Sequence, residues 1–171
     1  MFCHLLFYKC KALTPRSEIM KEELLSKDCI QIADSVTDWQ AAIKLAAQPM
    51  LNKGYIEERY IDAMIETVNT LGAYIVIAPN IAMPHARSES GALKNGFAIL
   101  KLKTPVYFDE SQDSRAVLIL PISCVDNAAH MKMLQALAAV LGDPELAEKV
   151  VGSNEIDEIY NIFANVELED E

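Results

Sequence analysis

The chain has 171 residues, of which 51% are apolar, so it is long and apolar enough for one globular domain and is not intrinsically disordered. A formal net charge of −10 disfavours nucleic-acid binding and favours basic protein partners. No run approaches the ~20 apolar residues that a membrane-spanning helix needs, and the four cysteines form no C-x-x-C pair, so we expect a reduced, cytoplasmic protein.

Residues 1–19 differ from the rest of the chain in charge. They hold three basic residues and one acidic residue, a balance of +2, so the remainder carries −12. Phe2 to Tyr8 is apolar but short, with no basic residue before it, and is not expected to be a signal peptide. Met20, followed by Lys-Glu-Glu-Leu-Leu, is typical of a chain start. We therefore expect residues 1–19 to be a poorly defined extension, and one hypothesis is that Met20 is the initiator.

The first half of the chain predicts a strand, two helices and a second strand. The strand covers 29–33, and a helix begins at Trp39, is strained at Pro49 and ends by Gly54. A second helix covers 57–71 and ends at Gly72; its apolar face holds Tyr60, Ile61, Met64, Ile65, Val68 and Leu71. The apolar residues Tyr74 to Ala78 predict a buried strand, with a turn at Pro79-Asn80.

The second half predicts two more strands and three helices. Strands are expected at 96–102 and at 116–122, separated by a polar loop, and the second is apolar throughout, as is typical of a strand buried on both faces. The next helix covers about 127–141, with Met131, Leu134, Leu137, Ala138 and Leu141 on its buried face. Asp143-Pro144 starts a further helix, and a last one follows Ser153. This alternation predicts an α/β fold: a single-domain sandwich with a central mixed five-stranded sheet flanked by helices on both faces.

One histidine stands where an apolar run gives way to a polar one, in the segment Ala-Met-Pro-His-Ala-Arg at 82–87. Pro84 fixes its own φ and favours an extended Met83, so the backbone that enters His85 is stiff. Arg87 brings a guanidinium close to any negative charge that the imidazole meets. The pattern indicates a histidine that accepts and passes on a phosphoryl group; the alternative is a strand-end histidine bonded to a backbone carbonyl.

A second candidate, His130, lies in the first turn of the helix that follows the most buried strand. Ligands bind in such strand-to-helix crevices of open α/β sheets, and the free N–H groups of a helix start suit a phosphoryl group. If both histidines line one crevice, His130 can donate a hydrogen bond to the phosphoryl oxygens while His85 holds the phosphorus. The alternative is a solvated residue. The third histidine, His4, is expected to be incidental.

Other chemistries have weaker support in the sequence. Cys124 could act as a nucleophile with His130 as its base, although a small buried strand-end cysteine fits better. A zinc site from His85, His130, Cys124 and Asp126 lacks a close-spaced ligand pair, so no metal and no cofactor is expected. The absence of a Walker A loop and of a G-x-G-x-x-G motif argues against a nucleotide-dependent kinase.

The segment 79–87 (Pro-Asn-Ile-Ala-Met-Pro-His-Ala-Arg) resembles the phosphohistidine motif of the enzyme IIA (EIIA) components of the bacterial phosphoenolpyruvate-dependent sugar phosphotransferase system, mannitol/fructose type. Three further segments resemble the same family in the same order, at 54–64, 91–96 and 127–130. The resemblance covers about 20–165, which we expect to form an EIIA type-2 domain followed by an acidic tail at 166–171.

The resemblance implies a protein-histidine phosphocarrier without a cofactor. His85 would accept the phosphoryl group from the phosphocarrier protein HPr and pass it to a cysteine of an enzyme IIB (EIIB), which links it indirectly to the membrane component EIIC. His130 would be the auxiliary histidine of the site. A regulatory module, whose phosphorylation state controls a protein partner, is the alternative.

The residues of two segments resemble one branch of the family in particular. Met-Pro-His-Ala-Arg at 83–87 and Tyr-Ile-Val-Ile-Ala-Pro at 74–79 look closest to the L-ascorbate branch. Mannitol-type members carry an arginine on the preceding helix where this chain has Thr67, and Arg87 would supply the stabilising charge instead. The sequence does not fix the sugar or the oligomeric state.

Overall fold

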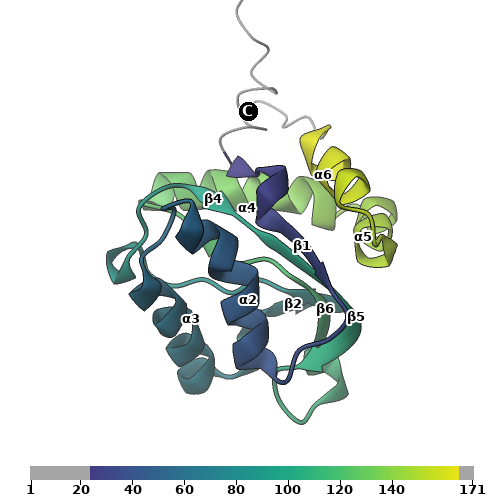
Figure 1. Ribbon diagram of the computed structural model, residues 1–171, viewed down its shortest axis with the longest axis horizontal. Helices are drawn as coiled ribbons and strands as arrows, with labels where there is room; N and C mark the ends of the chain where they lie inside the picture. The colour runs from purple at the N-terminus through teal and green to yellow at the C-terminus, as the bar shows by residue number, and fades with distance from the viewer. Residues whose placement is uncertain (1–23, 166–171) are drawn as a thin grey trace, which may run out of the picture.

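The computed structural model describes residues 24–165 (Figure 1). The expectations for the extension at 1–19, for an initiating Met20 and for the acidic tail at 166–171 therefore lie outside the described residues. Within 24–165, no helix is both long and apolar enough to cross a membrane.

A mixed five-stranded sheet forms the centre of the fold, as predicted. Its strand order is β1-β5-β6-β3-β2, with β1 Ile30–Ala33, β5 Ile99–Tyr107, β6 Arg115–Ile119, β3 Asn80–Ala82 and β2 Val76–Ala78. The pairs β1·β5 and β3·β6 are parallel, whereas β5·β6 and β2·β3 are antiparallel. A second, two-stranded sheet pairs β4 (Gly96–Phe97) with β7 (Ile122–Ser123).

Helices cover both faces of this sheet (Figure 1). One side carries α2 (Trp39–Asn52) and α3 (Glu58–Leu71), and the other carries α4 (Asn127–Leu141), α5 (Pro144–Gly152) and α6 (Ile156–Ala164). Short 3-10 turns lie at Lys27–Cys29, Ala73–Ile75, Ser88–Ser90 and Gln112–Ser114. The single-domain α/β sandwich expected from the alternation of helices and strands is confirmed.

Three aspartates cap the N-termini of helices, and Asp143 does so as the sequence predicts. Asp38 accepts a hydrogen bond from the backbone N–H of Ala41, and Asp126 does the same for Ala129, both at 2.7 Å. Asp143 caps α5, with Pro144 at the first helical position. Each cap satisfies an N–H group that the helix itself leaves without a partner.

The strand that includes Ile77 is an edge strand, so the prediction of a buried strand at 74–78 was wrong. Tyr74 lies in a 3-10 turn and is 42% exposed, while Ile77 in β2 is 49% exposed. The reason is topological: β2 is the last strand of the sheet and has one neighbour. An apolar run alone does not distinguish a central strand from an edge strand whose outer residues face a binding partner or solvent.

Two further predictions were wrong in detail. The apolar run at 96–102 is divided between two sheets: β4 pairs with β7, and β5 continues past it to Tyr107. On α4 the buried residues are Met133, Leu137 and Val140, whereas Met131 is 59% exposed. Apolar residues surround α4 on most sides, so their spacing did not specify which stripe faces the core.

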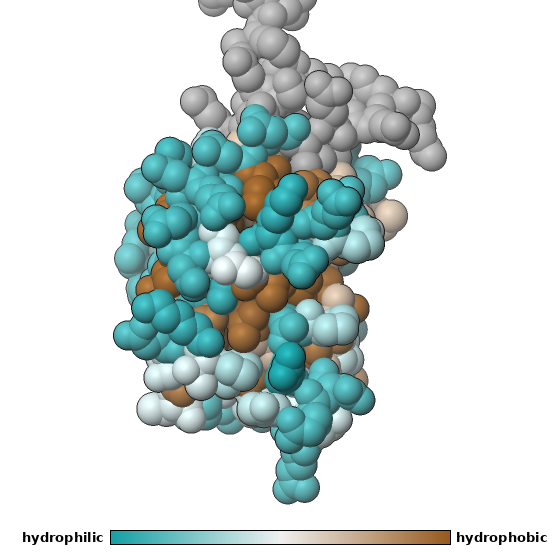
Figure 2. All heavy atoms as spheres, turned by 90° about the vertical axis from the view of Figure 1, so that its right-hand side faces the viewer, coloured by the Kyte–Doolittle hydropathy of each residue, from teal (hydrophilic) through white to brown (hydrophobic). Residues whose placement is uncertain are grey.

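The core fills the space between the sheet and the helices, and the apolar run at 116–122 is buried as predicted. The face seen in Figure 2, the right-hand side of Figure 1, is mostly hydrophilic, with a band of hydrophobic residues between the polar ones. The carboxyl ends of the paired strands β6 and β3 position the site, because the segments that follow both strands line it.

Lys101 is a charged residue within this core and gives a prediction about stability. Its side chain on β5 is 5% exposed, and its Nζ donates to the carbonyl oxygen of Leu102 at 2.8 Å. Burial lowers the pKa of this amine below its usual value. We expect Lys101→Met to raise the free energy of unfolding at pH 7 by about 1 kcal/mol, because the folded parent must desolvate a charge.

The pH dependence follows from the sign of the pKa change. The unfolded parent holds this proton more tightly, so the parent gains stability as pH rises through the folded-state pKa, and its deficit against Lys101→Met shrinks. Urea unfolding at several pH values measures this difference. Lys103→Met, at an exposed position of the same strand, is the control. A variant no more stable than the parent at pH 7 would contradict the prediction.

Candidate functional site

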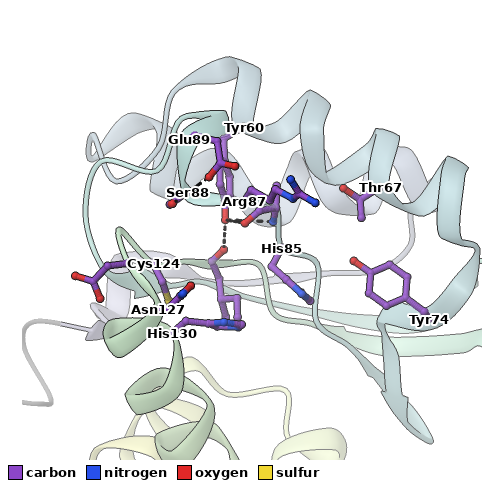
Figure 3. A pocket seen from close by; sticks show the side chains of 13 residues that line it. Tyr60, Thr67, Tyr74, His85, Arg87, Ser88, Glu89, Cys124, Asn127 and His130 are labelled. Carbon is purple, nitrogen blue, oxygen red and sulfur yellow. Dashed lines mark hydrogen bonds between the residues drawn. The ribbon is translucent and has the colours of Figure 1, made fainter.

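A cavity of about 500 Å³ opens where β3 and β7 end, and it brings together the predicted site residues (Figure 3). His85 and Arg87 line it from the loop after β3, and His130 lines it from the first turn of α4. Tyr60 and Thr67 line it from α3. Residues that are 45 positions apart in the chain, His85 and His130, thus share one crevice.

The backbone before His85 is held as the sequence predicts. Beyond the end of β3, the N–H of Leu120 donates to the carbonyl of Ala82 at 2.8 Å, and the N–H of Ile122 donates to that of Pro84 at 3.0 Å. Pro84 itself is buried. The backbone is therefore held to the neighbouring strand as far as Pro84, and His85 starts from a fixed position.

The hydrogen bond of the His85 ring assigns its tautomer. Its Nδ1 lies 2.9 Å from the carbonyl oxygen of Met83. A carbonyl oxygen can only accept, so in the neutral ring Nδ1 carries the proton and donates it. The lone pair of Nε2 is then free. The structure thus shows the backbone-carbonyl bond of the alternative interpretation and leaves the second nitrogen available, so the phosphoryl-acceptor interpretation stays a prediction.

Two other rings surround His85. The ring centroid of His130 is 5.8 Å away, with the planes inclined by 40°. The ring of Tyr74 approaches edge-on, with a centroid distance of 6.0 Å and an angle of 71°. Asp126 caps α4 next to His130, so this helix directs its N-terminal end toward the cavity that Asp126 and Asn127 also line.

Among the lining residues within 24–165, Arg87 is the one permanently cationic side chain. It is exposed, while Glu89 and Asp126 contribute carboxylates to the same lining. Thr67 lies across the cavity from the histidine loop (Figure 3), and its Oγ1 donates to the carbonyl of Ala63 at 2.6 Å. The position on α3 thus carries a neutral hydroxyl, and any negative charge in the cavity would have Arg87 as its guanidinium partner.

Cys124 lines the cavity but is a poor nucleophile. It is half-buried, and burial, together with the charge of Asp126, raises the pKa of its thiol to about 11. At neutral pH the thiol is therefore protonated and weakly reactive. Over residues 24–165, no three histidine, cysteine, aspartate or glutamate side chains are grouped so that they could hold a metal ion. The four residues considered for a zinc site do not form such a group, and the idea of Cys124 as a nucleophile loses its support.

Sequence reasoning missed the part that two tyrosines play. Tyr60 was predicted only as part of the apolar face of its helix, but its hydroxyl contacts the backbone of Ala86 and Ile122 beside the cavity. Burial raises the pKa of Tyr60 to about 12. Tyr74 was predicted to be in a strand, and instead its ring stands beside His85. Neither role leaves a signal in the local sequence, since each depends on segments that only the fold brings together.

Comparison with known proteins gives one family for this chain. Residues 23–166 match the family model described as "Phosphoenolpyruvate-dependent sugar phosphotransferase system, EIIA 2". The match includes the cavity and both of its histidines.

Individual relatives and solved structures are similar over most of the chain. The mannitol-specific cryptic phosphotransferase enzyme IIA component of Escherichia coli K12 is 35% identical over 135 residues, which are 79% of this chain and 91% of that protein. The solution structure of this E. coli enzyme IIA superimposes with a TM-score of 0.78 at 32% identity, over 85% of this chain and 97% of the other.

Two more proteins show the range of the similarity. The ascorbate-specific EIIA component of E. coli K12 is 30% identical over 114 residues, 67% of this chain and 74% of that one. The enzyme IIA of mannitol, solved in complex with its phosphorylated enzyme IIB from E. coli, superimposes with a TM-score of 0.72 at 24% identity, over 82% of this chain and 96% of the other.

Proposed function

Because this chain belongs to the EIIA type 2 family of the phosphoenolpyruvate-dependent sugar phosphotransferase system, and so to its phosphotransferase components, we propose that His85 is the residue that carries the phosphoryl group. Phosphorylated HPr is the proposed donor and a cysteine of a cognate EIIB the proposed acceptor, with an indirect link to a membrane EIIC. The transfer would take place in the cytoplasm.

The observation that carries the proposal is the free Nε2 of His85 in a cavity shared with His130 and Arg87. In the first step the lone pair of Nε2 attacks the phosphorus of the donor, and the bond between phosphorus and the donor breaks. Such transfers depend on in-line positioning and on stabilising charge at the equatorial oxygens. Arg87, the ring of His130 and the N-terminus of α4 are the groups that would supply this stabilisation.

The hydrogen bond to Met83 also serves the second step. After attack through Nε2, the ring keeps its proton on Nδ1 and carries a positive charge, which the Met83 carbonyl stabilises. A positively charged imidazole is a good leaving group. The EIIB thiolate would then attack the phosphorus, the bond between phosphorus and Nε2 would break, and neutral His85 would be restored.

L-ascorbate is the proposed sugar of this system. Support comes from the segments 74–79 and 83–87, which look closest to the ascorbate branch, and from an ascorbate-specific relative. The resemblance places an arginine of mannitol-type members where this chain has Thr67, which supports the same proposal.

Incubation with phosphorylated HPr and then with EIIB tests the proposed function. We expect label on His85 after the first addition and its loss to the EIIB cysteine after the second, faster with an ascorbate-system EIIB than with a mannitol-system EIIB. Label that stays on His85 with every EIIB would favour the regulatory alternative. No label on His85 would contradict the proposal.

Arg87→Ala is expected to slow transfer to His85 by about tenfold to a hundredfold, because it removes a charged donor from the cavity. Arg87→Lys should recover part of the rate, since it keeps the charge but loses the planar fork. Rapid-quench measurement at saturating donor separates this effect from weaker docking. Arg115→Ala, at an exposed position on β6, is the control. An unchanged rate in Arg87→Ala would remove Arg87 from the mechanism.

A further inference from the structure

The hydrogen-bond ladder between β3 and β6 continues beyond the ends of both strands. It passes from Leu120 to Ala82 and then from Ile122 to Pro84, each an N–H donating to a carbonyl. In a parallel ladder, a residue that donates to one neighbour accepts from the residue two positions further along. The next bond would therefore run from the N–H of Ala86 to the carbonyl of Ile122, directly beside His85.

That bond is replaced by a side chain. The N–H of Ala86 donates to Oη of Tyr60 at 3.2 Å, and this Oη lies 3.0 Å from the carbonyl oxygen of Ile122. It also lies 3.0 Å from the carbonyl oxygen of Ala86, so its single proton goes to one of two acceptors. The hydroxyl thus sits between two strand ends in the way that a bridging water does (Figure 3).

The ladder is also interrupted one step earlier. Pro84 has no N–H group, so it cannot donate to the carbonyl of Leu120, where the regular ladder would place a bond. The residues on either side of His85, Pro84 and Ala86, therefore donate no N–H hydrogen bond to the neighbouring strand. The neighbouring strand end, Ile122–Ser123, leads through Cys124 to the helix that carries His130.

We propose that Tyr60 is a positioning residue of the phosphoryl site, whose hydroxyl holds the two strand ends apart and so sets the spacing between His85 and His130. The effect of Tyr60 on the rate of phosphoryl transfer rests on the proposed function, whereas the bridge that its hydroxyl makes between the two strand ends does not. Tyr60 lies on α3 and is 1% exposed. Both histidines lie on other segments of the chain, so Tyr60 can act on them only through the backbone that its hydroxyl contacts. Because the pKa of Tyr60 is raised to about 12, the hydroxyl keeps its proton throughout the physiological range.

The structural part can be tested in the unmodified protein. A scalar coupling across a hydrogen bond, between the amide nitrogen of Ala86 and the carbonyl carbon of Ile122, reports a direct bond between them. We expect this coupling to be absent in the parent and the coupling from Ile122 N–H to the Pro84 carbonyl to be present. Detection of the Ala86–Ile122 coupling in the parent would overturn the proposal without any variant.

Tyr60→Phe tests the consequence. The ring still fills its buried site, but Ala86 and Ile122 lose their bridge, so we expect their direct coupling to appear and the ring resonances of His85 to shift. The rate of transfer from phosphorylated HPr to His85 should fall by about tenfold to a hundredfold. Tyr107→Phe, which removes an exposed hydroxyl from β5, should leave the rate and the His85 resonances unchanged.

Two results would overturn the role of Tyr60: a Tyr60→Phe rate within about twofold of the parent, or a slower rate with neither the new coupling nor a shift at His85. Failure of the proposed function is a separate outcome, since it would appear as an unlabelled His85 in the parent, whatever the coupling experiments show.

Discussion

His85→Gln is expected to take up no phosphoryl group from phosphorylated HPr. Glutamine has a similar reach and can still bond to the backbone, but its amide nitrogen has no nucleophilic lone pair. The effect is therefore complete loss of covalent labelling. Uptake of radiolabel followed by peptide mapping measures it.

The fold of His85→Gln should survive. The residue is half-buried and lies outside the main core, and the hydrogen bond to Met83 contributes about 1 kcal/mol at most. Thermal unfolding and an amide NMR spectrum check this before any rate is interpreted. A folded His85→Gln variant that is labelled as fast as the parent would mean that another residue accepts the phosphoryl group.

His130→Ala should give the second largest effect: transfer to His85 about a hundredfold slower, with the label still on His85. The ring of His130 is 5.8 Å from that of His85, close enough to donate to an oxygen of a phosphoryl group between them. Loss of one such donor in a preorganised site has an effect of this size. Single-turnover kinetics with saturating donor measures it.

The design of this experiment separates positioning from chemistry. The cap of α4 by Asp126 does not involve the His130 side chain, so the helix should begin at the same residue in the variant. His130→Asn keeps a donor on a shorter side chain and should retain part of the rate. Label mapped to His130 in the parent would show that His130 is itself an acceptor, and an unchanged rate in His130→Ala would show that its side chain has no part in the transfer.

The local sequence predicted well what depends on neighbours along the chain. Pro84 indicated a stiff entry to His85, and the structure confirms it through the ladder that continues to Pro84. Asp143 predicted a helix start because a short acidic side chain can reach the free N–H groups of the first turn. The mixed sheet followed from the alternation of helical and strand patterns.

What depends on the packing of distant segments could not be predicted in the same way. Ile77 lies on an edge strand because of the strand order, which no local pattern encodes. The buried face of α4 includes Met133 and not Met131. Apolar residues lie on most sides of this helix, so the packing of neighbouring elements decides which of them are buried. Tyr60 occupies a position on the apolar face of its helix, as a core residue does. Only the fold shows that its hydroxyl contacts the end of another strand.

The tautomer of His85 is likewise a property of the fold. The sequence left open which nitrogen reacts, because the answer depends on the direction of a carbonyl two residues earlier. With Nδ1 bonded to Met83 at 2.9 Å, only Nε2 keeps a free lone pair for the proposed reaction. The position of the phosphoryl group on the ring therefore tests the site geometry and the function together.

The most direct test is a nitrogen-15 NMR spectrum of the histidine side chains, recorded before and after phosphorylation by phosphorylated HPr. The predicted result is that one ring alone changes, that of His85, with phosphorus coupled to Nε2 and the proton kept on Nδ1. Phosphorus on Nδ1 of His85, or on His130, would contradict this account.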